Sequence, residues 1–321
     1  MVRPTIPCVQ GFVMQSFKVS YYLPVLGLLL AMLLWASSFV ALKIAFRAYH
    51  PMVVIFGRMA VASVCFLFFC PGFRRTVKLR PGDMKYILFM ALCEPCLYFI
   101  FEAKALVHTT ASQAGMVTAM LPILVALFAA WLLKERVAPA TWLGSSMAVI
   151  GVCWLSLEGV PTPAAPDPAL GNFYEFLAMV CATGYTITLK RLTRHYSPFF
   201  LTAAQAFMGS VFYLPFLFLP STTVPLHFEP ASGLAVIYLG AVITLGAYGL
   251  YNFGLKHIPA NQASAFVNLI PVFSVVLGWM VLDESFTLRQ CMAAVLVMAG
   301  VYVSQRRRRR AKLTEETYQT P

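Results

Sequence analysis

The sequence has few charged residues. Asp, Glu, Lys and Arg make up 11% of its 321 residues, and only 12 residues are acidic. A soluble domain carries about a quarter charged residues, so this chain has too few to cover a water-facing surface. It also contains no glycine-rich phosphate-binding motif and no polar stretch long enough for a soluble ATPase domain. The sequence therefore predicts no nucleotide and no other cofactor.

Targeting peptides and disulfide bonds are not indicated either. The N-terminal residues do not combine the basic, apolar and small-residue regions of a cleavable signal peptide, and they are not rich in Arg and Ser like a transit peptide. Translation could start at Met1 or at Met14. All of the eight cysteines except Cys8 lie in or at the end of apolar segments, so a secreted disulfide framework is not expected.

Long apolar runs dominate what the sequence does contain. Hydrophobic residues make up 60% of the chain, and a helix that crosses a bilayer needs about 20 mostly apolar residues. The runs predict an all-α polytopic membrane protein with ten transmembrane helices, at residues 22–42, 51–71, 85–103, 112–132, 138–157, 171–189, 198–219, 232–253, 260–281 and 289–305.

The basic residues are distributed unevenly between the two sides of this predicted bundle. If the N-terminus is cytoplasmic, most of the 24 Lys and Arg residues fall in cytoplasmic segments. This positive-inside bias predicts that both termini are cytoplasmic. The tail at 306–321, with five consecutive arginines, is expected to contact anionic membrane lipids. Topology thus accounts for the net charge of +12, and no nucleic acid partner is expected.

Two stretches of the sequence occur twice. "LKIAFRAYHP" at 42–51 shares Leu, Lys, Arg, Tyr and Pro with "LKRLTRHYSP" at 189–198, and "ALVHTTASQAGMVTAMLPI" at 105–123 matches "GLKHIPANQASAFVNLIPV" at 254–272. They predict two five-helix repeats, 22–157 and 171–305, followed by the basic cytoplasmic tail 306–321. An odd number of helices inverts the second repeat, and inverted repeats are typical of secondary transporters with a site between the halves. A receptor or scaffold that arose from an old duplication is the alternative.

The motifs resemble those of a known superfamily. "LLWASSFVALKIA", "ASQAGMVTAMLPILVALFAAWLLKER" and its echo "ANQASAFVNLIPVFSVVLGWMVLDES" are similar to segments of the drug/metabolite transporter superfamily, and within it to the EamA-like ten-helix permeases. The resemblance covers about residues 22–305. It implies a multi-pass carrier of the bacterial cytoplasmic (inner) membrane, often an efflux protein, for amino acids, other metabolites or drugs. We expect a monomer or a homodimer.

Charged side chains inside predicted spans are the first candidates for function. Arg58 and Glu94 lie about 10 and about 15 Å from the outer ends of their helices, at 1.5 Å per residue. They could therefore form an ion pair. Such a pair could be structural, or one or both residues could bind a substrate or couple transport to protons. Glu102 and Glu175 are assigned to helix ends.

Polar and aromatic residues on the helices expected at a central cavity complete the candidate set for substrate binding or coupling: Trp35, Ser38, Tyr98, Gln113, Tyr185, Tyr248, Asn252, Gln262 and Asn268. Amide side chains are costly in hydrocarbon, which favours Gln262 and Asn268. Pro122 and Pro271 are predicted in the middle of helices, where each leaves a backbone carbonyl free. They are candidate hinges.

The segment "ALCEPCLYFIFEAKAL" at 91–106 contains Cys93 and Cys96 on one helix face. Structural zinc needs four ligands, and the histidines are predicted in loops or at helix ends. A thioredoxin-like site needs a thiol that is activated near a helix N-terminus in a βαβ setting, and a helix in the middle of a membrane offers neither. The favoured interpretation is that these cysteines pack, with no metal bound.

The sequence thus predicts a secondary-active transporter rather than an enzyme. It would act on a small-molecule substrate by alternating access, and proton coupling is a hypothesis. The alternatives are a membrane sensor or structural protein on the same scaffold, and a membrane redox protein that uses Cys93 and Cys96.

Overall fold

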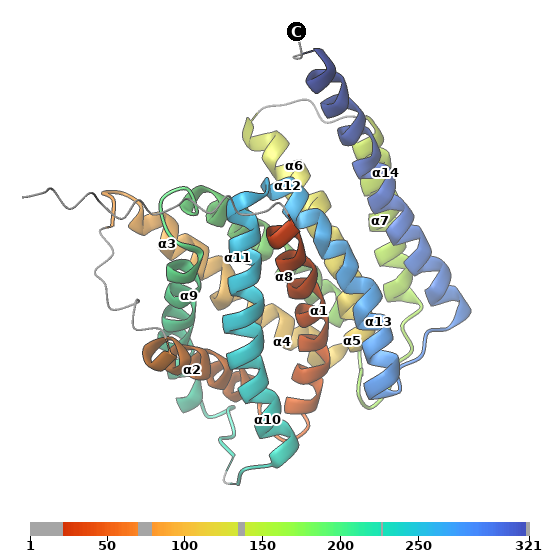
Figure 1. Cartoon of the computed structure of the whole chain (residues 1–321). Coiled ribbons are helices and arrows are strands. Elements are labelled where there is room, and N and C mark those ends of the chain that lie inside the picture. Colours follow the sequence, from red (N-terminus) through yellow and green to blue (C-terminus); the bar gives the residue numbers. More distant parts are fainter. Residues whose placement is uncertain (1–21, 70–78, 134–138, 226, 319–321) are drawn as a thin grey trace, which may run out of the picture.

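The computed structural model describes residues 22–69, 79–133, 139–225 and 227–318, and all regular structure in these ranges is helical. Figure 1 shows the helices packed into one bundle. The α-helices are α1 (Tyr22–Ala45), α2 (Pro51–Phe69), α3 (Met84–Ala91), α4 (Tyr98–His108), α5 (Ala111–Val117), α6 (Leu121–Leu133), α7 (Pro139–Leu157), α8 (Pro168–Leu192), α9 (Pro198–Tyr213), α10 (Pro230–Tyr238), α11 (Tyr248–His257), α12 (Ala260–Ala263), α13 (Leu269–Leu282) and α14 (Leu288–Tyr318).

Within the described residues, every predicted apolar run coincides with one helix or with consecutive helical segments, and residues 70, 71 and 138 of these runs lie outside the described residues. Among the described residues, eight helical stretches are long and apolar enough to cross a membrane, and Leu288–Ser304 is a shorter apolar helix. α8 is 25 residues long and carries Glu175, Lys190 and Arg191. The protein is an all-α polytopic membrane protein. The number of ten crossings stays a prediction, because it depends on α8 and α14.

Three helices begin with the same local signal, a polar residue followed by a proline. The side chains of Asp167, Ser197 and Glu229 each accept a hydrogen bond from a first-turn N–H group of α8, α9 and α10. The proline that follows needs no partner for a backbone N–H group at this position. At α10 the N–H of Ser232 donates to the Glu229 carboxylate over 2.6 Å, which holds the pKa of Glu229 below its usual value.

Four of the long helical stretches are interrupted. A wide π-helical segment, η2 (Leu92–Leu97), separates α3 from α4, and a second one, η5 (Leu239–Ala247), separates α10 from α11. Short 3-10 segments, η3 (Thr118–Met120) and η6 (Ser264–Asn268), separate α5 from α6 and α12 from α13. In the predicted repeats these interruptions fall at matching positions.

The two candidate hinge prolines lie beside these interruptions, not in the middle of continuous α-helices. Pro122 is the second residue of α6, just after η3, and Pro271 is the third residue of α13, just after η6. The first N–H groups of an α-helix have no partner within the helix, so a proline is well tolerated there. The hinge role of both residues stays a prediction.

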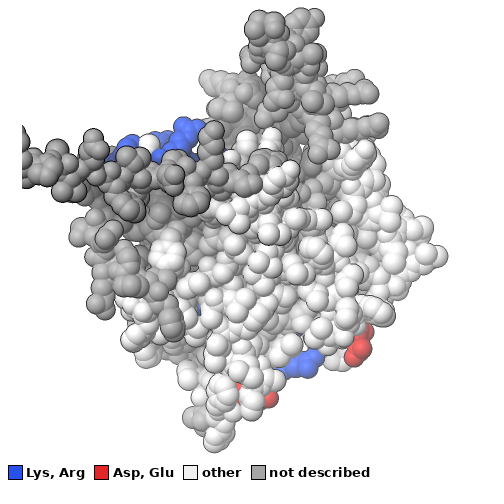
Figure 2. Space-filling view, viewed as in Figure 1, with Lys and Arg blue, Asp and Glu red and all other residues white. Residues whose placement is uncertain are grey.

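Charged side chains lie mainly at the two ends of the bundle. In Figure 2 the coloured residues gather near the upper and lower edges, and the face between them is almost entirely white. Large apolar side chains are exposed between the ends, including Leu33 on α1, Ile150 on α7, Val180 on α8 and Val295 on α14. An apolar band of this kind matches the hydrocarbon core of a bilayer.

Small residues hold the last helix against the bundle. α14 packs along α7, where a Cβ atom on Gly144 would lie 2.4 Å from the carbonyl oxygen of Gly300. Backbones approach this closely in membranes where glycine or another small residue lies at the contact, because packing rather than the hydrophobic effect drives helix association there. The core cluster centred on α1, α4, α8 and α11 lies on the other side of α13.

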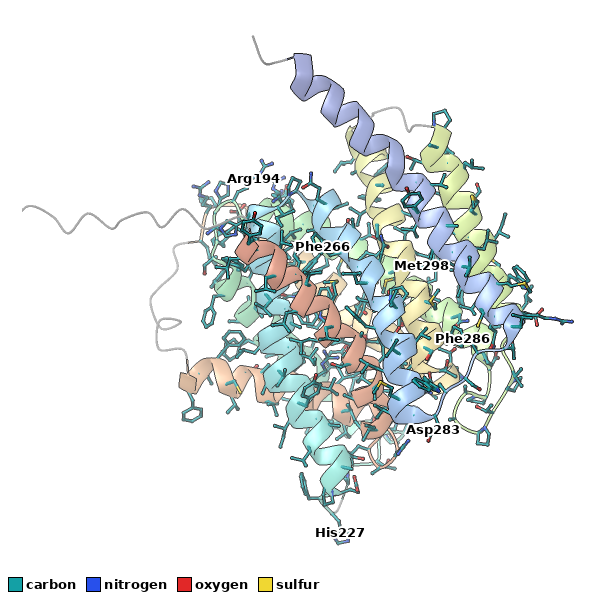
Figure 3. The ribbon with its side chains drawn as sticks, turned by 45° about the vertical axis from the view of Figure 1, so that its right-hand side comes forward. Arg194, His227, Phe266, Asp283, Phe286 and Met298 are labelled. Atoms are coloured by element: carbon teal, nitrogen blue, oxygen red, sulfur yellow. The ribbon has the colours of Figure 1, made fainter. Side chains whose placement is uncertain are left out.

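The start of α1 and the C-terminal end of α14 lie on the same, upper side of Figure 1. Figure 3 labels Arg194 near this side and Asp283 near the opposite one. The loop after α7 reaches the lower side, because its Ala164 carbonyl accepts a 2.6 Å hydrogen bond from Lys43 at the end of α1.

We expect the upper side to be cytoplasmic. A membrane-impermeant maleimide should therefore label Ala164→Cys in intact cells and label Arg194→Cys only after lysis, with the parent chain as the background control. Both positions are exposed. Labelling of Arg194→Cys from outside and of Ala164→Cys only after lysis would show that the orientation is the reverse.

Candidate functional site

A small cavity lies in the centre of the bundle, where the interrupted helices meet. It has a volume of about 40 Å³, which is room for a few water molecules when one water needs about 10–15 Å³. Sites for drug-sized ligands have about 300–1,000 Å³. The cavity is lined by Trp35, Ser38, Phe39, Arg58, Glu94, Tyr98, Glu102, Thr118, Leu121, Met179, Ala182, Tyr185, Thr186, Tyr248, Tyr251, Val267 and Ile270.

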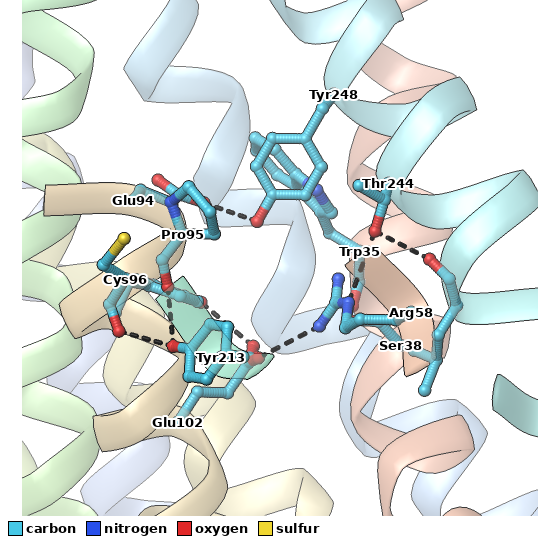
Figure 4. A network of polar contacts seen from close by, with 12 residues as sticks. Trp35, Ser38, Arg58, Glu94, Pro95, Cys96, Glu102, Tyr213, Thr244 and Tyr248 are labelled. Carbon is cyan, nitrogen blue, oxygen red and sulfur yellow. Dashed lines mark hydrogen bonds and ion pairs between the residues drawn. The ribbon is translucent and has the colours of Figure 1, made fainter. Parts of the chain in front are cut away.

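The backbone leaves the helical conformation at Glu94. Its φ and ψ are −149° and 118°, and the Glu94–Pro95 peptide bond is cis. The carbonyls freed by this break face α9 (Figure 4). Gln205 donates to the Glu94 carbonyl over 3.2 Å. The Tyr213 hydroxyl lies within hydrogen-bond distance of the carbonyls of Pro95, at 3.0 Å, and Cys96. Irregular backbone inside a membrane requires partners of this kind, and α9 supplies them.

The Glu94 carboxylate points into the cavity and is 4% exposed. It accepts a hydrogen bond from the Tyr248 hydroxyl. The Tyr248 ring packs edge-on against Trp35, with ring centroids 5.1 Å apart, and Trp35 also packs against Tyr251 at 4.8 Å. Together these three rings form an aromatic wall beside the carboxylate.

Arg58 forms its ion pair with Glu102, so the predicted pairing of Arg58 with Glu94 is wrong. Its Nη1 atom is 3.5 Å from Glu102 Oε2, and its Nε atom donates to Thr244 Oγ1 over 3.3 Å. Tyr98 donates to the other Glu102 oxygen over 3.1 Å. The guanidinium also lies 4.0 Å from the centre of the Phe99 ring. A buried ion pair needs such additional partners, because the desolvation of both charges is costly.

The placement of Glu102 and Glu175 near helix ends is also wrong. Both are buried, at 4% and 0% exposure. The helix that carries Glu102 continues to His108, beyond the predicted end at 103, and α8 begins at Pro168, seven residues before Glu175. Among the described residues, four charged side chains are buried: Arg58, Glu94, Glu102 and Glu175. The bundle thus encloses three carboxyl groups and one guanidinium.

Six other predicted residues lie in or directly behind the cavity wall. Trp35, Ser38, Tyr98, Tyr185 and Tyr248 line it. Asn252 stands behind Tyr185, whose hydroxyl donates to Asn252 Oδ1 over 2.6 Å, and Asn252 in turn donates to Thr202 over 2.7 Å. Asn252 therefore orients a cavity residue without facing the cavity.

The structure places the remaining three candidates elsewhere. Gln113 is buried in a polar cluster at the junction of α4, α5 and α8, where it accepts a hydrogen bond from Asn172 over 3.0 Å. Gln262 is exposed. Asn268 is half-buried near the cavity-lining Val267, and its Oδ1 atom has no hydrogen-bond partner in the described structure. None of the three lines the cavity, and their roles stay predictions.

Cys93 and Cys96 are both buried, with free thiols, on either side of Glu94. They lie in η2, not on a regular helix face. No group of three or more His, Cys, Asp or Glu side chains suited to a metal ion occurs in the part of the chain that the structure describes. Both thiols lie within the helix break. Cys93 packs closely against α8, because a Cβ atom on Gly184 would lie 2.9 Å from Cys93 Sγ.

Comparison with known proteins identifies the family of this fold. The model of the EamA-like transporter family matches residues 23–157 and again residues 169–305. A solved crystal structure has a similar fold, with a TM-score of 0.60 over 90% of this chain and 98% of that chain, at 22% sequence identity.

Several similar proteins are named transporters. The uncharacterized transporter YcxC of Bacillus subtilis is 29% identical over 82% of this chain and 86% of its own length. An uncharacterized transporter of Archaeoglobus fulgidus is 24% identical over 86% of this chain and 95% of its own. A protein of Streptantibioticus cattleyicolor named "Probable terminal-alkyne amino-acid exporter" is 25% identical over 88% of this chain and 93% of its own.

The hydrogen bonds from α9 to the helix break should be a main source of its stability. Tyr213→Phe removes the hydroxyl that faces two buried carbonyls, and an unmet buried acceptor costs about 1–3 kcal/mol. We expect a lower midpoint of thermal unfolding in detergent. Tyr302→Phe is the control, because that tyrosine is 64% exposed. Equal midpoints for the two variants would mean that Tyr213 does not hold the break.

Proposed function

We propose that this chain, which belongs to the EamA-like transporter family, is a secondary-active exporter of small amphipathic metabolites such as amino acids. The chain is a multi-pass membrane transporter, and the proposal adds substrate class, direction, alternating access and proton coupling. The observation that carries it is the central cavity, where a buried guanidinium, buried carboxyl groups and aromatic rings meet beside a broken helix.

The arrangement of breaks supports a two-halved transporter. The family model matches the two halves separately, and each half has one π-helical and one 3-10 interruption in its third and fourth predicted spans. Discontinuous helices at the interface of inverted repeats are a common way to build a substrate site in secondary transporters. Rocking of one half against the other would then expose the cavity to each side in turn.

The small volume of the cavity supports alternating access. With about 40 Å³ it has no room for an amino acid, so helices must separate to admit one. On the lower side, Glu284 holds the end of α13 to the start of α5, because its two carboxylate oxygens accept from the N–H groups of Ala111 and Ser112 over 2.9 and 2.8 Å. A carboxylate is stabilised at a helix N-terminus. Release of this contact would open the lower side.

The charges in the cavity support a substrate that carries both signs. Arg58 offers a guanidinium that can pair with a substrate carboxylate in place of Glu102, since the two are joined by one 3.5 Å contact. Glu94 and the rings of Trp35 and Tyr248 offer a carboxylate and π faces to a substrate ammonium group. The printed name of the Streptantibioticus relative, an amino-acid exporter, agrees with this class.

The basic residues support a location in the bacterial cytoplasmic membrane with both termini inside. An exporter in this orientation would take substrate from the upper side of Figure 1 and release it at the lower side, where Glu284 lies near the labelled Asp283 of Figure 3.

Export can be tested without knowing the substrate. Untargeted mass spectrometry should find metabolites that accumulate outside cells that overexpress the protein and inside cells that lack it. The same compounds should leave reconstituted vesicles that contain the parent chain or Arg289→Gln, a variant of an exposed residue, and not vesicles that contain Arg58→Gln. A sensor or structural protein would change no metabolite in the cells and release none from vesicles.

Proton coupling is expected to depend on Glu94. A charged carboxylate is less costly in a cavity open to water than in a closed one, so the proton affinity of Glu94 should differ between the open and closed states. A proton gradient can bias the cycle through that difference. Glu94→Gln keeps the shape and removes the proton site, whereas Glu94→Asp keeps a carboxyl group.

A gradient of one pH unit is worth about 1.4 kcal/mol per coupled proton, which corresponds to about tenfold accumulation. Vesicles with Glu94→Gln should lose this accumulation and keep substrate exchange, while Glu94→Asp should keep part of it. Asp283→Asn, at an exposed position, is the control. Undiminished accumulation by Glu94→Gln would show that Glu94 is not the coupling group.

A further inference from the structure

Glu175 is the one buried carboxyl group without a partner among the described residues. It is 0% exposed, and neither of its carboxylate oxygens has a hydrogen-bond partner. Glu94 and Glu102 differ in this respect, because Glu94 accepts from Tyr248 and Glu102 accepts from Arg58 and Tyr98.

The packing of α8 on α4 places Glu175 at the level of Glu102. A Cβ atom on Gly171 would lie 2.6–2.9 Å from atoms of Thr109 and Ala105, so the two helices touch there. The two helices run in opposite directions. Counted from this contact, Glu175 lies one turn toward the C-terminus of α8, and Glu102 lies about one turn before Ala105, toward the N-terminus of α4. Two carboxyl groups therefore lie at the same level of two touching helices.

No cation faces Glu175 from the elements packed around it. From α4 the titratable groups on its side are Glu102 and Tyr98, with Arg58 of α2 beyond Glu102. The two other titratable groups of α4 lie on the side of Tyr174: exposed Lys104 is 5.4 Å from the centre of the Tyr174 ring, and the His108 ring is 6.3 Å from it.

The other neighbouring elements add no positive charge at this level. α5, η3, α6 and α12 carry no titratable side chain. η2 contributes Cys93, Glu94 and Cys96. α11 contributes Tyr248 and Tyr251 on the cavity side, while its Lys256 and His257 are exposed in its last turn. The only titratable residue on α7 is Cys153, which is exposed, and the basic residues of α3 and of the far end of α8 meet near Tyr86, where Arg191 lies 3.9 Å from the ring.

We propose that Glu175 is a second proton-binding site of this protein, separate from Glu94, and that it holds a proton in the closed conformation. An ionised carboxylate in this position would have neither a hydrogen-bond donor nor a cation, which is strongly unfavourable in a membrane interior. In a neutral carboxylic acid only the C=O and O–H dipoles lack hydrogen-bond partners, and no charge is buried. Protonation also removes the repulsion between Glu175 and Glu102.

The Arg58 guanidinium lies near two carboxyl groups, those of Glu102 and Glu175, and this gives Glu175 a role in the transport cycle. This role rests on the proposed transport function. While Arg58 is paired with Glu102, Glu175 must stay neutral. When Arg58 turns to another anion, or when water enters, the balance among the three groups changes and Glu175 can release its proton. Each return to the closed state requires Glu175 to take up a proton again, so its proton uptake and release would follow the closing and opening of the cavity, in addition to those of Glu94.

Infrared spectroscopy of the full chain in lipid tests the protonation itself and needs no substrate. A protonated carboxylic acid has a C=O band apart from the carboxylate bands, and the band moves on transfer to D2O. Glu175→Gln should lose one such band at neutral pH. Glu158→Gln is the matched control and should lose none, because Glu158 is partly exposed and lies 3.6 Å from Arg289.

Independence from Glu94 is tested in the same way. Glu94→Gln should affect a different band, and the double variant should show the sum of both changes. If Glu175→Gln folds with parental thermal stability and loses no band, or if both single variants lose the same band, the second site does not exist. A failure to export any metabolite would count against the proposed function and would leave this result unaffected.

Discussion

The structure depends on one constraint, which is that every backbone polar group inside a membrane must find a partner. At Glu94 the chain leaves the helix, and the carbonyls around it would be unmet if α9 did not lie beside them. Gln205 and Tyr213 supply the donors. Because the break is held from outside the cavity, the Glu94 side chain is free to point into it, toward Tyr248. The same contact therefore stabilises the fold and positions a candidate coupling group.

The break also distributes charge in the bundle. If residues 84–108 formed one straight α-helix, Glu94 and Glu102 would lie at fixed positions eight residues apart along it. The irregular turn instead sends Glu94 to the aromatic wall and leaves Glu102 to pair with Arg58. Two different carboxyl environments result, one with a single tyrosine donor and one with a cation. Glu175, with neither, makes a third. Environments that differ this strongly are how proteins assign different roles to chemically identical groups.

Apolar length was enough to predict the helices, because a bilayer-spanning helix must be about 20 residues long and mostly apolar. Depth and partners were harder to predict. Glu102 lies six residues before the end of α4, or about 9 Å at 1.5 Å per residue, and this depth is close to that of Arg58. The sequence pattern does not show this depth, because it predicts that the helix ends at residue 103. The sequence pattern alone does not show that Glu94 is not the partner of Arg58, because that depends on the break in the helix. The cost of buried amides favours Gln262 as a cavity residue, but it is exposed. The four-residue helix α12 is too short to show from its sequence which residues face outward.

The second helix of each predicted repeat contacts the broken helix of the other repeat. The sequence aligns Arg58 of α2 with Gln205 of α9. Gln205 donates to the backbone of η2 at Glu94, and Arg58 donates to Thr244 in η5, whose hydroxyl in turn donates to the carbonyl of Leu239. Each π-helical interruption is thus contacted by the second helix of the other half, while in η5 the Leu239 carbonyl itself is met by Thr244 of the same segment. A motion that separates the halves must loosen both interruptions together, so access to the cavity and the geometry of its charged groups change in the same step.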